Sequence, residues 1–495
     1  MPTTTPDTTK NTTPAAASSE EYASTIAAQA TPKGNGAIHI VRLSGPKAKN
    51  LLKACFAPAG GSRKDFEPWK LRRGFFHDQD GKKLDDVLCV YMPGPATYTG
   101  EDCAEIYCHG GQAIVSLILE TLLSQGAAAA RRGEFTQRAF LNGRMDLSQA
   151  EAVAELIAAH GKMALEQSLR RLDGELSRRV QAVRAALETV RVHMSLAVDF
   201  PDDEVEILAR PEFLGHVRQA RTTLAGLLSG VDRAHVVQNG AKVVLAGSVN
   251  AGKSSLMNAL LGRSRALVTN IPGTTRDFIE EAVLFADLPV RLVDTAGLRN
   301  ADDSVESLGI ELSRRQAFNA DCLVLVLDGE ALGKESLEAA SCPDEAFREM
   351  TAKTPSAQPV VVVWNKSDLV PVLEAGPSWH PAWCRREDGT PLPFLPVSAK
   401  NGDGTDALCS LVRDVILQSL PQGTEEVAPN ERQAAALRSA LAEMDELVSD
   451  IEGGQLYDLL SVRLDTICAY LDSVIGVGTP QDVLNKVFEG FCIGK

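Results

Sequence analysis

Apolar residues occur in short, strand-sized runs through the first part of the chain. AIHIVRLSG from Ala37, DDVLCVYMPG from Asp85 and CAEIYCHGG from Cys103 are rich in the β-branched and apolar residues typical of strands. AIVSLILETLLSQG from Ala113 instead repeats its apolar residues at helical spacing. Strands and a helix mixed within about 120 residues predict an α+β domain.

The hydrophobic period then changes twice. Helical spacing prevails from Asp146 to about Val237, with a break at FPDDE from Phe200, and it returns from Asn430 to Ser473. Between these stretches, from Ala241 to about Pro421, strand runs alternate with helices. This order predicts a multidomain chain in which an α/β domain is inserted into a helical domain whose two halves pack on each other. The predicted parts are a disordered tail at 1–22, an α+β domain at 23–143, a first helical part at 144–238, an α/β domain at 239–421 and a second helical part at 422–495.

Composition and charge narrow the class of protein. The chain has 495 residues, 44% of them hydrophobic and 23% charged, which is typical of a globular protein with several domains. Its net charge of −15 gives no global attraction to nucleic acid or anionic lipid, and the apolar runs are too short to cross a membrane. The ten cysteines are widely spaced, and the tail lacks the apolar core of a signal peptide. These features predict reduced thiols, with Cys103 and Cys108 buried, and a cytoplasmic location.

A phosphate-binding loop follows the first strand of the α/β region. AKVVLAGS runs into GSVNAGKS, Gly247 to Ser254, and then into the helical SLMNALLG, which is the strand, loop and helix context of GxxxxGK[ST]. Glycines let the backbone amides surround phosphates, Lys253 neutralises the β- and γ-phosphates, and Ser254 offers a hydroxyl to Mg²⁺. A glycine-rich turn before a core helix is the structural alternative.

Four further motifs follow along the chain in the order PGTTRD, DTAG, NKSD and SAK, which is the order found in GTPases. DTAG from Asp294 ends a strand, PGTTRD supplies a Mg²⁺ hydroxyl, and Asp368 of NKSD can accept two hydrogen bonds that guanine offers and adenine does not. SAK, from Ser398, supplies a backbone contact to the guanine carbonyl. The chain is therefore predicted to bind GTP. The predicted nucleotide contacts are Asn250, Ala251, Gly252, Lys253, Ser254, Ser255, Thr269, Thr274, Thr275, Asp294, Thr295, Ala296, Gly297, Asn365, Lys366, Asp368, Ser398, Ala399 and Lys400.

The group that orients the attacking water is not evident from these motifs. Leu298 follows DTAG where Ras-like enzymes have a glutamine, and the next loop offers Asp302, Asp303 and Glu306. The residues alone do not choose among these carboxylates. Asn250 can coordinate a monovalent cation beside the phosphates, or it can simply favour a turn.

These motifs, together with TIAAQATPKGNGAIHIVRLSG, FTQRAFLNGRMDLSQAEA and the final FCIGK, closely resemble the tRNA-modification GTPase family MnmE (TrmE), of the TrmE-Era-EngA-like group. The resemblance extends from about Ser24 to Lys495. It implies a homodimer that acts with the FAD-dependent protein MnmG, as a heterotetramer or larger complex, to add an aminomethyl or carboxymethylaminomethyl group to the wobble uridine of certain tRNAs. It also implies that 5-formyl- or methylene-tetrahydrofolate binds the N-terminal domain.

The resemblance assigns roles to particular residues. It implies folate contacts at Arg42, Glu105, Arg144 and Lys495, catalytic roles for Glu306, Lys253 and Cys492, Mg²⁺ at Ser254 and Thr275, and K⁺ at Asn250, Thr269, Ile271 and Thr274. The family often has lysine where Arg144 stands, so the contact geometry there can differ. Glu306 would be the water-positioning carboxylate that the residues alone left open.

Two surface features remain. The pairs Arg170/Arg171 and Arg178/Arg179 form either a tRNA-binding stripe or a solvated helix face. The C-terminal segment predicts a helix capped by Thr479 with an apolar stripe at Val483, Val487 and Phe488, which would hold Cys492 and Lys495 against the folate pocket. The alternative function is a ribosome-assembly or signalling switch GTPase without modification chemistry.

Overall fold

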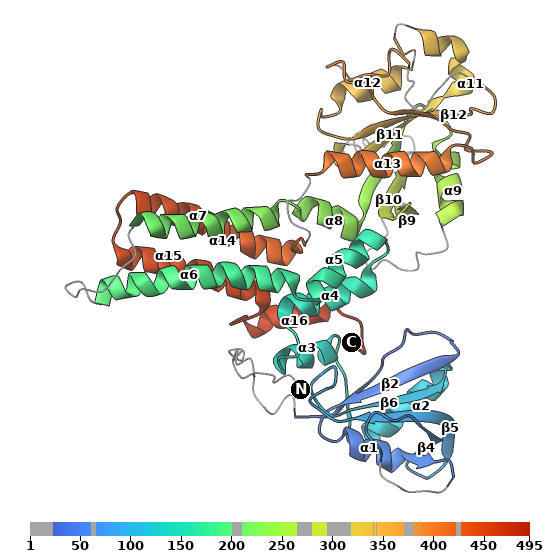
Figure 1. The fold of residues 1–495 in the computed structure, drawn as a ribbon. Coiled ribbons are helices and arrows are strands. Elements are labelled where there is room, and N and C mark those ends of the chain that lie inside the picture. The colour runs from blue at the N-terminus through green and yellow to red at the C-terminus, as the bar shows by residue number, and fades with distance from the viewer. Residues whose placement is uncertain are drawn as a thin grey trace, which may run out of the picture. The chain divides into compact units, whose positions relative to one another are not determined.

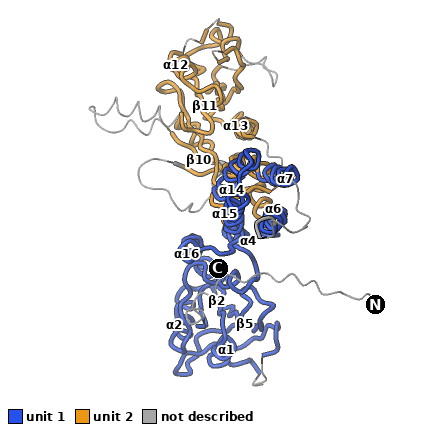
Figure 2. Tube along the Cα trace, turned by 90° about the vertical axis from the view of Figure 1, so that its left-hand side faces the viewer, with its two compact units in different colours: residues 1–157, 169–224, 435–495 blue, residues 158–168, 225–434 orange. Residues whose placement is uncertain are grey.

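The computed structural model describes residues 23–60, 66–199, 210–264, 280–294, 318–339, 341–342, 344–370, 381–386, 388–421 and 427–495. It divides into two compact units, shown in Figure 2. The first comprises 1–157, 169–224 and 435–495, and the second comprises 158–168 and 225–434. The domain bounds given above remain predictions. No helix among the described residues is long and apolar enough to cross a membrane.

A mostly antiparallel sheet opens the first unit. Its described strands follow the order β3-β4-β5-β6-β2-β1-β7, and only β1 and β7 pair in parallel. Helices α1 and α2 bury their apolar side chains in the core on one face, and α3 follows the last strand. The predicted α+β domain is confirmed. The elements are β1 (Ile26–Gln29), β2 (Ile38–Ser44), α1 (Ala48–Cys55), β3 (Phe56–Pro58), β4 (Arg72–His77), β5 (Lys83–Met92), β6 (Cys103–His109), α2 (Gln112–Ser124), β7 (Ala128–Ala129) and α3 (Glu134–Leu141).

The register of this sheet separates core residues from site residues. Val41 and Leu43 of β2 are fully buried in the core, and Cys103 and Cys108 are buried thiols, as predicted. Arg42 lies between the two core residues and pairs opposite Glu105 of β6. Because successive strand residues point to opposite faces, Arg42 and Glu105 project from the face opposite that core.

Long helices complete the first unit (Figure 1). Arg184 of α6 donates from Nε to Asp472 Oδ1 of α15 at 2.5 Å, and Arg218 of α7 pairs with Glu452 of α14 at 2.5 Å. These ion pairs join residues more than 200 positions apart in the sequence, which confirms that the two helical halves pack on each other. The helices are α4 (Leu147–Ala158), α5 (Lys162–Leu172), α6 (Glu175–Asp199), α7 (Arg210–Leu228), α14 (Glu431–Glu452) and α15 (Tyr457–Ile475). Residues 162–168 of α5, 225–228 of α7 and 431–434 of α14 belong to the second unit.

The C-terminal helix α16 (Gln481–Glu489) docks as predicted but differs in two details. Pro480 is its N-cap, and the buried Thr479 hydroxyl makes no hydrogen bond to any described residue, so Thr479 does not cap the helix. Its most buried residues are Leu484 and Phe488. In the first turn of the helix, the side chain of Leu484 points into the core, whereas that of Val483 is only partly buried. These two residues pack in a cluster with side chains of α3 and α4.

The second unit is an α/β domain. Its described strands follow the order β13-β12-β11-β8-β10-β9, all parallel except the β9–β10 pair. Two apolar cores lie on the sheet, one with α8, α9 and α13 and the other with α12. The elements are α8 (Val231–Asn239), β8 (Ala241–Ala246), α9 (Lys253–Ser264), β9 (Glu280–Phe285), β10 (Leu288–Asp294), β11 (Cys322–Asp328), α11 (Gly329–Leu332), a 3₁₀ turn (Lys334–Glu338), α12 (Glu345–Lys353), β12 (Val360–Asn365), β13 (Phe394–Pro396) and α13 (Thr405–Ser419).

Candidate functional site

The carboxyl ends of four parallel strands meet at one edge of the second sheet. Strand β8 leads into the phosphate-binding loop, β10 ends at Asp294, β11 at Asp328 and β12 at Asn365. In parallel α/β sheets this edge is where ligands bind. The fold therefore brings together the phosphate-binding loop, Asp294 and Asn365.

Close packing explains the glycines of the loop. A Cβ on Gly247, which has φ +148°, would lie 2.1 Å from Val326 O, and one on Gly252, with φ +87°, would lie 2.2 Å from Asn365 Nδ2. Side chains at these positions would push the loop off the strand ends. Asn250 also has a left-handed backbone, with φ +62°, and it is exposed.

Two side chains are positioned to handle phosphate and metal. Lys253 is 9% exposed, and its Nζ donates to Gly247 O at 3.1 Å and to Ser248 O at 2.7 Å, which holds the ammonium inside the loop. Ser254 Oγ donates to Asp294 Oδ2 at 2.7 Å. The loop hydroxyl and the strand-end carboxylate thus form an adjacent pair of oxygens, the ligand type that Mg²⁺ prefers.

The base-reading motif is tied to its neighbours. Asn365 Nδ2 donates to Ala251 O at 2.8 Å, and Asn365 Oδ1 accepts from Ala399 N at 3.1 Å, so this buried amide links the phosphate loop to SAK. Asp368 Oδ1 accepts from Ser398 Oγ at 2.7 Å. These bonds fix the position of the Asp368 carboxylate.

Two carboxylates that the sequence patterns did not predict, Asp328 and Glu330, lie beside this motif. Lys366, with φ +62°, donates from Nζ to Asp328 Oδ2 at 2.8 Å and to Glu330 Oε2 at 3.0 Å, and these hydrogen bonds raise the pKa of the lysine. The available signal was the position of Asp328 at a strand end, like that of Asp294.

Several predicted residues lie outside the described part of the chain. This applies to the second loop hydroxyl, to the residues after Asp294 and to all three candidate carboxylates. They are Thr269, Ile271, Thr274, Thr275, Thr295, Ala296, Gly297, Leu298, Asp302, Asp303 and Glu306. Of the other predicted contacts, Ser255 is exposed in the first turn of α9, and Lys400 is exposed in a turn after β13.

A second site lies on the N-terminal sheet. Arg42 donates from Nε to Glu105 Oε1 at 2.9 Å, and Tyr107 donates to Glu105 Oε2 at 2.7 Å. Burial, followed by the bond to Glu105, raises the pKa of Tyr107 to about 12. Arg42, Glu105 and Arg144 line one cavity of about 270 Å³, so three of the four predicted folate contacts meet.

The C-terminus reaches the same region. Arg132 Nε donates to Phe491 O at 2.9 Å, and Phe135 N donates to the Lys495 carbonyl at 3.3 Å, which docks the last residues on α3. A Cβ on Gly494, with φ +91°, would lie 2.1 Å from Gln29 O, so the tail lies directly against β1. Burial lowers the pKa of Lys495, and the charge of Arg42 lowers it further. The Cys492 thiol is exposed.

The predicted basic stripe on the helices is wrong for Arg171. This residue is 4% exposed and forms an ion pair with Glu155 of α4, so it can neither contact tRNA nor form a solvated face. Arg178 donates to Asp173 O at 2.7 Å, and Arg179 lies 3.4 Å from Glu175 Oε1. Arg179 is thus ion-paired within its own helix, and Arg178 is bound to a backbone carbonyl.

A phosphate loop joined to a guanine-selective strand end defines the chain as a P-loop GTPase. The model of the MnmE helical domain matches residues 147–492, and the model of the GTP-binding protein TrmE N-terminus matches residues 25–144. The chain belongs to the family of the tRNA modification GTPase MnmE.

Three relatives with that name are similar along nearly their whole length. The protein of Nitratidesulfovibrio vulgaris is 46% identical over 481 residues, covering 96% of this chain and 100% of the relative. The protein of Lawsonia intracellularis is 41% identical over 475 residues, which cover 95% of this chain and 99% of the relative. The protein of Chloroflexus aurantiacus is 39% identical over 474 residues, which cover 95% of this chain and 99% of the relative.

Proposed function

We propose that this chain hydrolyses GTP to drive modification of the wobble uridine in certain tRNAs, adding an aminomethyl or carboxymethylaminomethyl group with an FAD-dependent partner of the MnmG type. The observation that carries the proposal is that one chain combines a guanine-selective P-loop site with a pocket of Arg42 and Glu105 near its own C-terminus. A ribosome-assembly or signalling switch GTPase would require the P-loop site, but its function would not require the pocket of Arg42 and Glu105.

For GTP hydrolysis, the protein's residues bind and orient the nucleotide. Lys253, held now by loop carbonyls, is placed to exchange these for β- and γ-phosphate oxygens. Ser254 and Thr275 would hold Mg²⁺ through their hydroxyls, and the Asp294 carboxylate beside Ser254 would help to hold it. Mg²⁺ supplies neutralisation of charge that develops on the phosphates. Glu306 would orient the attacking water.

A potassium ion would assist the same step. The Asn250 amide makes no hydrogen bond within the described residues and lies exposed on the phosphate loop, so its carbonyl oxygen is available for a cation. Thr269, Ile271 and Thr274 would supply the remaining oxygens. Positive charge at this position would act as an arginine finger does in other GTPases.

The N-terminal pocket fits a folate. Arg42 and Lys495 can bind its carboxylates or ring oxygen, Glu105 can accept from its ring nitrogens, and Arg144 adds positive charge at the rim. A 5-formyl- or methylene-tetrahydrofolate supplies a one-carbon unit when bound. The exposed Cys492 thiol lies on the segment that carries Lys495, and this supports a role for the thiol in the modification chemistry.

The assembly and location are part of the proposal. A homodimer would bring two second units together so that a potassium site forms, and the dimer would bind the MnmG-type partner as a heterotetramer or larger complex. We expect the assembly to act on tRNA in the cytoplasm.

Mass spectrometry of wobble uridine tests the function. Cells whose only copy carries Lys253→Ala should accumulate unmodified wobble uridine, whereas cells with the unchanged chain should not. Normal modification in cells that lack the chain altogether would refute the proposal, because the activity would then belong to another protein.

A further inference from the structure

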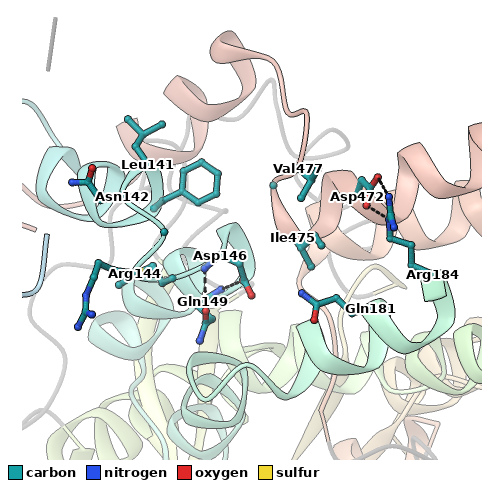
Figure 3. A pocket seen from close by; sticks show the side chains of 14 residues that line it. Leu141, Asn142, Arg144, Asp146, Gln149, Gln181, Arg184, Asp472, Ile475 and Val477 are labelled. Carbon is teal, nitrogen blue, oxygen red and sulfur yellow. Dashed lines mark hydrogen bonds and ion pairs between the residues drawn. The ribbon is translucent and has the colours of Figure 1, made fainter. Parts of the chain in front are cut away.

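A second and larger cavity lies within the first unit, where the α3–α4 connection faces α6 and the end of α15 (Figure 3). Its volume is about 760 Å³, within the range of about 300–1,000 Å³ typical of ligand sites. Apart from Arg144 at its rim, no residue that lines it belongs to the nucleotide site or has a role implied by the resemblance. Its walls include the apolar side chains of Leu141, Met145, Ile475 and Val477.

Polar groups on α6 are available inside this cavity. Arg184 is held by Asp472 through Nε at 2.5 Å and Nη2 at 3.2 Å, so the guanidinium is fixed while Nη1 has no partner among the described residues. Gln181 is one helical turn away, is exposed, and makes no hydrogen bond within the described part of the chain. An amide offering both donor and acceptor beside a fixed donor matches the edge of a nucleobase.

The charge balance favours a neutral ligand. Among the residues lining the cavity, Asp472 offsets Arg184, and the charge of Asp146 opposes that of Arg144. An anionic chain, such as the glutamate tail of a folate, would find no excess of positive charge here. A flat heterocycle would instead place its faces on Leu141, Ile475 and Val477 and its edge on Gln181.

Arg144 connects this cavity to the smaller one. It lines both, and its stem lies near Gly100 of the N-terminal domain, with Cγ 3.4 Å from where a Cβ of that glycine would stand. Figure 3 shows its guanidinium turned away from Gln181. The two cavities therefore share Arg144 as a lining residue and are neighbours. A donor and an acceptor of a one-carbon unit must lie near each other for transfer.

We propose that the larger cavity receives the unstacked wobble base of the tRNA, with Gln181 and Arg184 binding the edge of the uracil ring. This assignment rests on the proposed function, since it supplies the acceptor site for that reaction. Enzymes that act on a base commonly take it out of the stack into such a pocket.

Photocrosslinking with the full-length chain tests the assignment. An anticodon stem–loop carrying 4-thiouridine at the wobble position is crosslinked, and the labelled peptides are identified by mass spectrometry. We expect crosslinks within 181–184 or 475–477. Val477→Trp, which fills the cavity from a 36% exposed position, should lower crosslinking and wobble-uridine modification about tenfold or more. The matched control Val192→Trp, at a 50% exposed position of α6 outside the lining, should leave both unchanged.

Further readouts separate the outcomes. Binding of 5-formyl-tetrahydrofolate and GTP hydrolysis should stay normal in Val477→Trp. Gln181→Ala changes an exposed residue and keeps the fold, and it should also lower crosslinking. Crosslinks confined to other segments, or normal modification in both variants, would overturn the assignment. Loss of folate binding in Val477→Trp would make the cavity a folate subsite and also overturn it. Normal wobble uridine in cells lacking the chain would instead refute the proposed function itself.

Discussion

Replacing Asp368 with asparagine isolates base recognition from folding. Asp368 Oδ1 accepts from Ser398 Oγ at 2.7 Å, and an asparagine oxygen can accept the same bond, so the second unit should keep its stability. Guanine, however, loses a charged acceptor for its two donors and meets the amide's own donors. Charge-assisted bonds contribute about 1.5–3 kcal/mol each, so the loss should be about 3 kcal/mol or more, which is over a hundredfold in GTP affinity.

Titration with a fluorescent GTP analogue measures this change. Xanthosine triphosphate should bind Asp368→Asn better than GTP does, because its base presents a carbonyl where guanine has an amino group. Asp388→Asn provides the matched control: Asp388 is exposed in a turn of the same unit, where its Oδ1 accepts from Thr390 N at 2.9 Å, and an asparagine keeps that bond. GTP affinity equal to that of the unchanged chain in Asp368→Asn would show that this carboxylate does not read the base.

Four other predictions address separate parts of the molecule. Cys492→Ser should abolish wobble-uridine modification in cells yet leave thermal unfolding and GTP hydrolysis near normal, because the thiol is exposed; fully modified tRNA would exclude a chemical role. Arg171→Met should destabilise the first unit by about 3 kcal/mol in denaturant unfolding, since Glu155 loses its buried partner, and a change below about 1 kcal/mol would contradict the burial argument. Burial lowers the pKa of Lys495 in the folded state, so the unfolded state binds more protons between that value and about 10.5, and stability should rise with pH in this window. In unfolding curves measured over a series of pH values, Lys495→Met should remove this rise in stability. The same slope of stability against pH in the variant and the unchanged chain would refute the link between Lys495 and stability. GTP hydrolysis should be much faster in K⁺ than in Na⁺, and Glu306→Ala should lose turnover while keeping GTP affinity; equal rates in the two salts would count against the potassium site.

The sequence predicted the α/β unit well because its strands are continuous apolar runs. Buried parallel strands such as CLVLVL and PVVVVW have no polar face. The motif residue Asn365 directly follows PVVVVW, and Asp294 ends the strand LPVRLVD in the same way. Because parallel strands align their carboxyl ends, local patterns were enough to bring these residues together. Asp328 occupies the same kind of position but was not predicted as a site residue, since its role depends on Lys366, which follows the neighbouring strand β12.

Contacts between distant segments could not be predicted in this way. An arginine pair on a helix has the same pattern whether it is solvated or buried, and only the position of Glu155 on α4 decides for Arg171. Likewise, the helical period of α16 predicted an apolar face that includes Val483. The buried face instead includes Leu484, the next residue, because the helix packs against α3 and α4. The cavity beside Gln181 is formed by three separate segments, and no local pattern marks it.

The most direct test of the central claim follows a labelled one-carbon unit from tetrahydrofolate to tRNA. The full chain, an MnmG-type partner with its flavin, unmodified tRNA and either GTP or a non-hydrolysable analogue are combined, and label in wobble uridine is measured by mass spectrometry. The proposed function predicts label with GTP, little with the analogue, and none when Lys253→Ala replaces the chain. Equal labelling with GTP and the analogue, or label that forms without this chain, would contradict it.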